Sequence, residues 1–184
     1  METLQQTVER VSAQVREHCR AKGYAEGPWL NPLVPVDCIS AWTMARHLAS
    51  AGEIDHYLAV APEGHVYGFF FEKLGVRVHS VFVDYPPRRC EVIDDLSEIR
   101  DSHVLVIEDD VVSGVSLKLV MDQLQLHAPR LVSLYLGRER DGQQLDNVPP
   151  GIAKTYLAEE RLDPNLRAQY ETEFLTAFRD DDPA

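Results

Sequence analysis

The first apolar residues of the chain recur every three to four positions, at Leu4, Val8, Val11 and Val15. This spacing places apolar side chains on one face of a helix. Gly23 follows where such a helix would end, because glycine is the usual residue just beyond a helix C-terminus. The pattern predicts an amphipathic first helix and then an irregular connection. We expect Asp37 to cap a second helix that reaches about Ser50.

The centre of the chain alternates short apolar runs with helical patterns. Apolar runs typical of buried strands cover residues 57–60, 76–83, 104–107 and 131–136, and helical patterns cover residues 65–74 and 115–126. This alternation predicts an α/β fold, with an open, mostly parallel sheet flanked by helices. Ligands of such sheets bind beyond the carboxyl ends of the strands, which points to the loops at 61–64 and 108–116.

Length and apolar content indicate one domain. The chain has 184 residues, of which 45% are hydrophobic, enough for a single buried core. We expect this core at about residues 38–137, with Trp42 and Met44 inside it. A last helix at about residues 164–179 should begin at Asp163-Pro164, since proline is favoured in the first helical turn.

Charge and cysteine content exclude several functions. A net charge of −12 argues against binding to nucleic-acid backbones, which depends on Lys and Arg. It also repels anions, so a phosphate site must be built locally from backbone amides, arginine or a metal ion. The apolar runs are too short to span a bilayer and the N-terminus lacks a signal-peptide pattern. Cys19, Cys38 and Cys90 suggest neither a disulfide framework nor a metal site. We therefore expect a soluble cytoplasmic protein.

Three adjacent carboxylates follow the apolar run at 104–107: Glu108, Asp109 and Asp110. Repulsion and desolvation make this arrangement costly without a partner, such as sugar hydroxyls or a divalent cation. Residues 113–116, Ser-Gly-Val-Ser, then open a helix, where glycine allows close backbone approach and free N–H groups point at a ligand. A phosphate cradle one turn from a hydroxyl or metal clamp matches the two ends of ribose 5-phosphate.

The whole segment 104–117 reads Val-Leu-Val-Ile-Glu-Asp-Asp-Val-Val-Ser-Gly-Val-Ser-Leu. It resembles the signature of type I phosphoribosyltransferases, in which an apolar strand is followed by two acids and a loop ending Thr/Ser-Gly-x-Thr/Ser-Leu. The resemblance implies that Glu108 and Asp109 are catalytic and hold the ribose hydroxyls and Mg²⁺. It also implies a loop around the 5-phosphate, formed by Asp110, Val111, Val112, Ser113, Gly114, Val115 and Ser116. The alternative is an ordinary polar turn before a serine-capped helix.

Residues 58–75 are similar to the pyrophosphate loop and following helix of the same family. The resemblance implies pyrophosphate binding at Pro62, Glu63, Gly64 and His65, through the backbone amides of the last three. Glu63 departs from the basic or small residue that many members carry there. The family also places a flexible catalytic loop between residues 83 and 103, which implies that Arg88 and Arg89 bind the leaving pyrophosphate. The alternatives are a plain strand-to-helix turn and a solvated arginine pair.

The resemblance implies a Mg²⁺-dependent enzyme that transfers phosphoribose from 5-phosphoribosyl-1-pyrophosphate to a purine or pyrimidine base. Its partners would be these small molecules, and the oligomeric state is left open, with a homodimer as one alternative. A variable hood over the base would come from residues 23–37, 138–162 or both. Trp29, Tyr156 and Leu157 are its stacking surfaces or ordinary core residues. Val112 stands where purine-specific members carry an acid, so a non-catalytic regulatory protein that binds a phosphoribosyl ligand is the alternative function.

Overall fold

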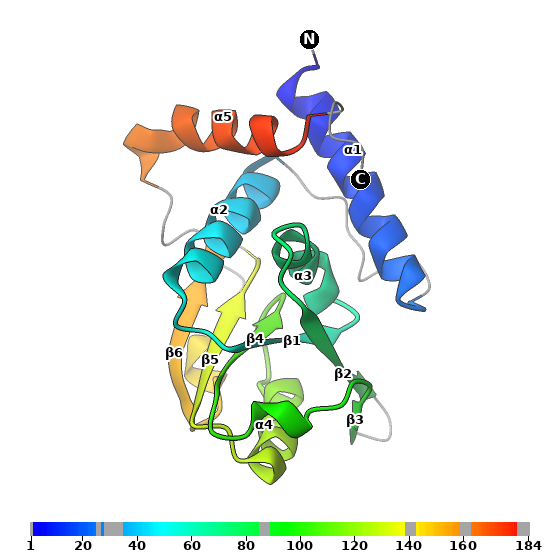
Figure 1. Cartoon of the computed structure of the whole chain (residues 1–184), viewed down its shortest axis with the longest axis vertical. Helices are drawn as coiled ribbons and strands as arrows, with labels where there is room; N and C mark the ends of the chain where they lie inside the picture. Colours follow the sequence, from blue (N-terminus) through cyan, green and yellow to red (C-terminus); the bar gives the residue numbers. More distant parts are fainter. Residues whose placement is uncertain are drawn as a thin grey trace.

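Six strands form one sheet in this computed structural model, with helices on both of its faces (Figure 1). The structure describes residues 2–24, 27, 35–84, 89–138, 143–158 and 163–179. The strands are β1 (His56–Ala61), β2 (Val78–Asp84), β3 (Arg89–Val92), β4 (His103–Glu108), β5 (Leu131–Leu136) and β6 (Ile152–Leu157), and their order is β3-β2-β1-β4-β5-β6. Only β3 runs antiparallel to its neighbour β2 within this sheet. The predicted fold class is confirmed.

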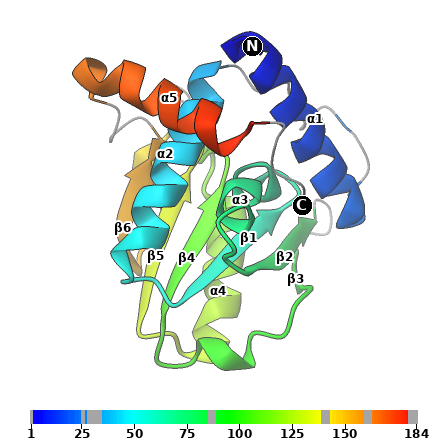
Figure 2. The ribbon, with the colours of Figure 1, turned by 45° about the horizontal axis from the view of Figure 1, so that its top comes forward.

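The helices pack in two layers. They are α1 (Leu4–Ala21), α2 (Pro35–Ala51), α3 (Gly64–Glu72), α4 (Val115–His127) and α5 (Arg167–Ala177), with short 3-10 turns η1 (Ser97–Ile99), η3 (Leu145–Asn147) and η5 (Pro164–Leu166). Residues of α1, α2, α3 and α5 share one hydrophobic core, whereas α4 and η1 contribute to a second core on the other face. Figure 2 shows α5 crossing one end of α2, with α1 beside α3.

Strand β4 separates the two cores. Leu105 and Ile107 belong to the core under α2 and α3, whereas Val104 and Val106 belong to the core under α4. Side chains of a strand point alternately to the two faces, so a strand covered on both faces must be apolar throughout. Because the apolar run of β4 is buried on both faces, the acids that follow it lie at the carboxyl end of this central strand.

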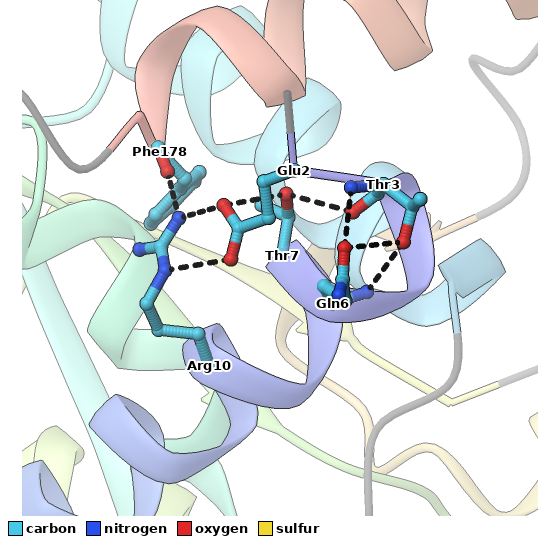
Figure 3. A network of polar contacts seen from close by, with 6 residues as sticks. All are labelled: Glu2, Thr3, Gln6, Thr7, Arg10 and Phe178. Carbon is cyan, nitrogen blue, oxygen red and sulfur yellow. Dashed lines mark hydrogen bonds and ion pairs between the residues drawn. The ribbon is translucent and has the colours of Figure 1, made fainter.

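Helix α1 is fixed at both of its ends. At the first end Arg10 donates from Nε and Nη2 to the carboxylate of Glu2, at 3.1 and 2.7 Å, and it also donates to the carbonyl oxygen of Phe178 just beyond α5 (Figure 3). At the other end Lys22 Nζ lies 2.8 Å from Glu72 Oε1 on α3. Tyr24, which follows α1, stacks on Phe82 near the end of β2, with ring centroids 6.4 Å apart.

Several predicted features are confirmed and others are corrected. Trp42 and Met44 are buried, and Gly23 follows α1 with a φ of +91°. Helix α2 begins at Pro35, so Asp37 lies in its first turn and the prediction of an N-cap is wrong. Strands β3 and β6 were not predicted. None of the helices in the described ranges is long and apolar enough to cross a membrane.

Candidate functional site

A cavity of about 680 Å³ opens at the carboxyl ends of β1, β2 and β4. From β1 the chain passes through α3 to β2 on one side, and from β4 it passes through α4 to β5 on the other. Ligands of open α/β sheets bind where the strand order reverses in this way. The cavity brings together most of the residues singled out in the sequence, from Pro62 and Glu63 to Glu108–Gly114 and Ser116.

The loop before α4 exposes backbone donors to this cavity. Gly114 adopts a left-handed φ of +70° immediately before the first helical residue. Within the described part of the chain, the amides of Val112, Ser113 and Gly114 make no hydrogen bond. Unpaired N–H groups at the start of a helix form an anion site, because the helix dipole adds to their partial positive charge. The geometry fits a bound phosphate.

Residues that the sequence did not single out brace the same loop. The Val111 amide donates to Gln143 Oε1 at 2.7 Å, and Asn147 Nδ2 donates to the carbonyl oxygen of Val112 at 2.5 Å. A β-carbon on Gly114 would lie only 2.0 Å from the carbonyl oxygen of Asn147. The loop conformation therefore depends on contacts with η3 as well as on its own sequence.

Four carboxylates line the cavity: Glu63, Glu108, Asp109 and Asp110. Glu108 is only 6% exposed. Burial, and then the charge of Asp109, raise the pKa of Glu108 well above its usual value. Burial raises the pKa of Glu63 and of Asp110 as well, with Asp109 adding to both. A bound cation or hydroxyl donors would stabilise the charged form of each of these acids.

Arg138 is the basic side chain among the described residues of the cavity wall. Its Nη2 lies 3.1 Å from Asp109 Oδ2, and its Nη1 donates to Asp110 Oδ2 at 2.8 Å. Burial works against the charged guanidinium, but Asp109 and Asp110 outweigh it and raise the pKa of Arg138. Arg138 was not among the site residues predicted from the sequence. Its position two residues after β5 was the available signal, because carboxyl ends of parallel strands meet at one edge.

The predicted pyrophosphate loop is placed in the cavity in part. Pro62 and Glu63 line the wall. The Glu63 amide interacts with the carboxylate of its own side chain, whereas within the described structure the amide of Gly64 makes no hydrogen bond. The prediction for His65 is wrong, because its amide donates to the Pro62 carbonyl at 3.1 Å. The His65 side chain is fully buried away from the cavity, with Nε2 2.9 Å from Ser80 Oγ. Gly64 serves packing, since a β-carbon there would lie 2.3 Å from the Ile107 carbonyl oxygen.

The predicted flexible loop is replaced in part by a strand. Arg89 begins β3, is exposed, and lies 3.6 Å from Asp84 Oδ2 through its Nε. It does not belong to the cavity wall. The prediction of a loop is therefore wrong at Arg89, and its catalytic role stays a prediction. Arg88 lies outside the described residues, as does Trp29.

The remaining predicted residues take other positions. Val115 faces a neighbouring groove, together with Lys118 and Asp122. Tyr156 and Leu157 are buried in β6, so they pack in the core instead of offering stacking surfaces. Of the two segments expected to form a hood, the first contributes Tyr24 to the cavity wall and the second contributes Arg138.

The acids suit a divalent cation as a partial set of ligands. Among the described residues, no three His, Cys, Asp or Glu side chains are grouped to hold a metal ion by themselves. Mg²⁺ is commonly held by one or two carboxylates, with water and ligand phosphates filling the other positions. Glu108 and Asp109 fit that role, because hard carboxylate oxygens face a cavity whose neighbouring loop fits phosphate.

The chain matches no protein-family model and no curated protein. Solved structures with a similar fold include a hypothetical protein from Neisseria gonorrhoeae with bound ppGpp, at 14% identity and a TM-score of 0.48, covering 74% of this chain and 92% of that one. A hypoxanthine-guanine phosphoribosyltransferase from Bacillus anthracis has 15% identity and a TM-score of 0.48, over 66% and 77%. A purine phosphoribosyltransferase from Pyrococcus horikoshii has 12% identity and a TM-score of 0.48, over 66% and 81%. At these identities and TM-scores they assign neither an activity nor a ligand to this chain.

Proposed function

We propose that the protein is a Mg²⁺-dependent phosphoribosyltransferase that uses 5-phosphoribosyl-1-pyrophosphate to phosphoribosylate a purine or pyrimidine base. One observation carries this proposal. The Gly114 loop, with its unpaired amides, and the buried Glu108 with its neighbour Asp109 face the same cavity at the reversal of the strand order. Ribose 5-phosphate needs an anion site and a hydroxyl site within one cavity, and helix-terminal amides can supply the first.

In the proposed reaction the bond from ribose C1 to pyrophosphate breaks, a bond from C1 to a nitrogen of the base forms, and the proton on that nitrogen passes to the leaving pyrophosphate or to water. Positive charge develops on the ribose while negative charge develops on the leaving pyrophosphate. The 5-phosphate lies against the amides of the Gly114 loop, and Glu108 and Asp109 orient the ribose through its hydroxyls. The pyrophosphate would be bound by the amide of Gly64 and, once its own carboxylate releases it, by the amide of Glu63. Catalysis is then mainly orientation and charge stabilisation.

Mg²⁺, held by Glu108 and Asp109 together with the donor, would supply the positive charge that this acidic cavity lacks. Four carboxylates and one guanidinium line the described wall. A diphosphate ester would be repelled from such a wall without added cations. The proposed metal dependence follows from this charge balance.

A second function is favoured by the residue at position 112. Val112 is 60% exposed beside the cavity and has no group to accept a proton. A regulatory protein that binds a phosphoribosyl ligand or nucleotide without turnover has no need of an acid there. Binding of the ligand is common to both functions, whereas release of pyrophosphate is not.

Turnover with a panel of bases distinguishes the transferase from the regulatory protein. The protein is incubated with 5-phosphoribosyl-1-pyrophosphate, Mg²⁺ and purine, pyrimidine or pyridine bases, and pyrophosphate and nucleotide are quantified together. Equal amounts of pyrophosphate and nucleotide with a purine or pyrimidine support the transferase. Tight donor binding without turnover supports the regulatory protein. Absence of binding by any phosphoribosyl ligand contradicts both.

A further inference from the structure

Arg138 is placed by the backbone directly beside the acids. The amide of Gly137 donates to the Glu108 carbonyl at 3.0 Å, and the amide of Arg138 donates to the Asp109 carbonyl at 2.9 Å. The parallel pairing of β4 and β5 is thereby extended by two residues. A β-carbon at Gly137 would lie 2.2 Å from Cδ1 of Tyr67, so the backbone approaches this ring as only glycine allows. The sheet therefore fixes the backbone of Arg138 beside the acids, within reach of its side chain.

The guanidinium engages Asp109, one of the two carboxylates that the proposed function assigns to the ligand, and the neighbouring Asp110. Asp109 Oδ1 accepts from the Asp110 amide at 2.7 Å, and Asp109 Oδ2 lies 3.1 Å from Arg138 Nη2. Both oxygens of Asp109 thus have a donor already. The second arm of the guanidinium binds Asp110 Oδ2 at 2.8 Å. A divalent cation at Asp109 Oδ2 would meet this positive charge within a few ångströms.

We infer that Arg138 is a positioning residue that holds Asp109 and Asp110 in the ligand-free protein and competes with a divalent cation for them. The inference rests on the proposed function, because that function places the cation at Asp109. Two cations repel at short range, so the metal binds only as the guanidinium leaves Asp109. Arg138 then weakens binding of the metal alone, so that the metal binds mainly together with an anionic ligand.

The side chain is exposed enough to move. The exposed fraction of the Arg138 side chain is 41%, against 13% for Asp109 and 24% for Asp110. The acids are fixed at the end of β4, whereas the arginine reaches them from the cavity side on a long flexible stem. Release of the guanidinium into water requires no change in the sheet. The ion pair therefore behaves as an exchangeable contact and not as part of the core.

Binding of Mn²⁺ alone tests the competition. Protein stripped of metal with chelator is titrated with Mn²⁺, without donor or base, and free Mn²⁺ is followed by electron paramagnetic resonance. We expect Arg138→Gln to tighten Mn²⁺ binding by about tenfold or more, since charge-assisted hydrogen bonds are lost from the competing state. Arg138→Lys keeps the charge but not the two-armed geometry, and should lie between Arg138→Gln and the parent.

Arg130→Gln is the matched control, because it removes the same charge at the amino ends of β1 and β5, away from the cavity. There Arg130 pairs with Asp55 at 3.9 Å. Its Mn²⁺ affinity should stay within about twofold of the parent at ordinary ionic strength. Unchanged or weaker binding in Arg138→Gln would overturn the inference, and so would equal tightening in Arg130→Gln. Absence of Mn²⁺ binding in both parent and Arg138→Gln would overturn it as well. Ribose 5-phosphate binding in excess chelator reports on the phosphate loop separately, so failure of the proposed function is recognised independently.

Discussion

The carbonyl oxygen of Asn147 occupies space that any side chain at Gly114 would need, 2.0 Å from the position of its β-carbon. The same asparagine donates from Nδ2 to the carbonyl of Val112. Turn η3 therefore packs against the Gly114 loop and requires glycine at the centre of that loop. Gly114 also needs its left-handed φ of +70°, which costs an ordinary residue about 1 kcal/mol or more.

Gly114→Ala should weaken binding of ribose 5-phosphate by more than about tenfold, because the loop must shift away from η3 and its amides lose their common direction. Calorimetric titration measures the change. Gly75→Ala is the control, since Gly75 has a φ of +78° with nothing within 4 Å of the added β-carbon. It should lose similar stability from backbone strain and keep its affinity. Equal affinity in Gly114→Ala and the parent would show that the phosphate binds elsewhere.

Gly64→Ala should affect the pyrophosphate end of the donor more than the phosphate end. The new methyl group would collide with the carbonyl of Ile107 and displace the start of α3 from β4. We expect affinity for 5-phosphoribosyl-1-pyrophosphate to fall by about tenfold and affinity for ribose 5-phosphate to fall much less. Gly68→Ala, where the nearest atom would lie at 3.4 Å, should change neither. Equal losses for both ligands in Gly64→Ala would contradict the assignment of this loop.

Glu108→Gln should raise the stability of the fold at alkaline pH and weaken binding of 5-phosphoribosyl-1-pyrophosphate. Burial raises the pKa of Glu108 in the folded protein. The folded state therefore keeps the Glu108 proton to a higher pH than the unfolded state does. The stability that this proton contributes is complete below about 4.5, the pKa in the unfolded state, and is lost as the pH rises from there through the raised pKa of the folded state. Thermal unfolding should show a gain in Tm for Glu108→Gln at about pH 8 that vanishes near pH 4.5. The exposed Glu98→Gln removes the same charge and should show no such trend.

His65 should make the fold less stable in acid. Burial chiefly, with Lys22 and His18, lowers the pKa of His65 to about 3. Between the unfolded value of about 6.5 and this folded value, the unfolded state binds a proton that the folded state does not, so the free energy of unfolding falls as the pH falls. The contribution has a maximum slope of about 1.4 kcal/mol per pH unit.

Urea unfolding of the parent and His65→Gln, from about pH 7.5 down to about pH 4.5, tests this proton linkage. The variant should be less stable at neutral pH, since it loses ring contacts with Tyr24. The two curves should then converge in acid as the parent loses its advantage. Parallel curves over the whole range would show that His65 titrates normally in the folded state.

The sequence predicted those parts of the fold that depend on local pattern. The apolar run before Glu108 predicted a strand buried on both faces, and the Gly114 segment predicted the start of a helix. Strands β3 and β6 escaped prediction because they are edge strands, half exposed, with polar residues such as Arg89 and Lys154. Pairing with one neighbour, and not their own hydrophobicity, makes them strands.

The site was predicted where it is contiguous in sequence and missed where it is assembled by the fold. Arg138, Gln143 and Asn147 reach the loop at 109–114 from 28 to 35 residues away. Their segment is polar and carries no motif. The opposite error arose at His65, where helix α3 takes the amide for its own first turn, which the sequence did not reveal.

Donor binding with and without metal addresses the central claim most directly. Parent protein, Asp109→Asn and Glu108→Gln are titrated calorimetrically with 5-phosphoribosyl-1-pyrophosphate, first in Mg²⁺ and then in chelator. We expect the parent to bind the donor in Mg²⁺ and to lose more than about tenfold in affinity in chelator. The part of the donor affinity that depends on Mg²⁺ should be smaller in both variants, and smallest in Asp109→Asn. Parent affinity that is the same with Mg²⁺ and chelator, and unchanged in both variants, would contradict it.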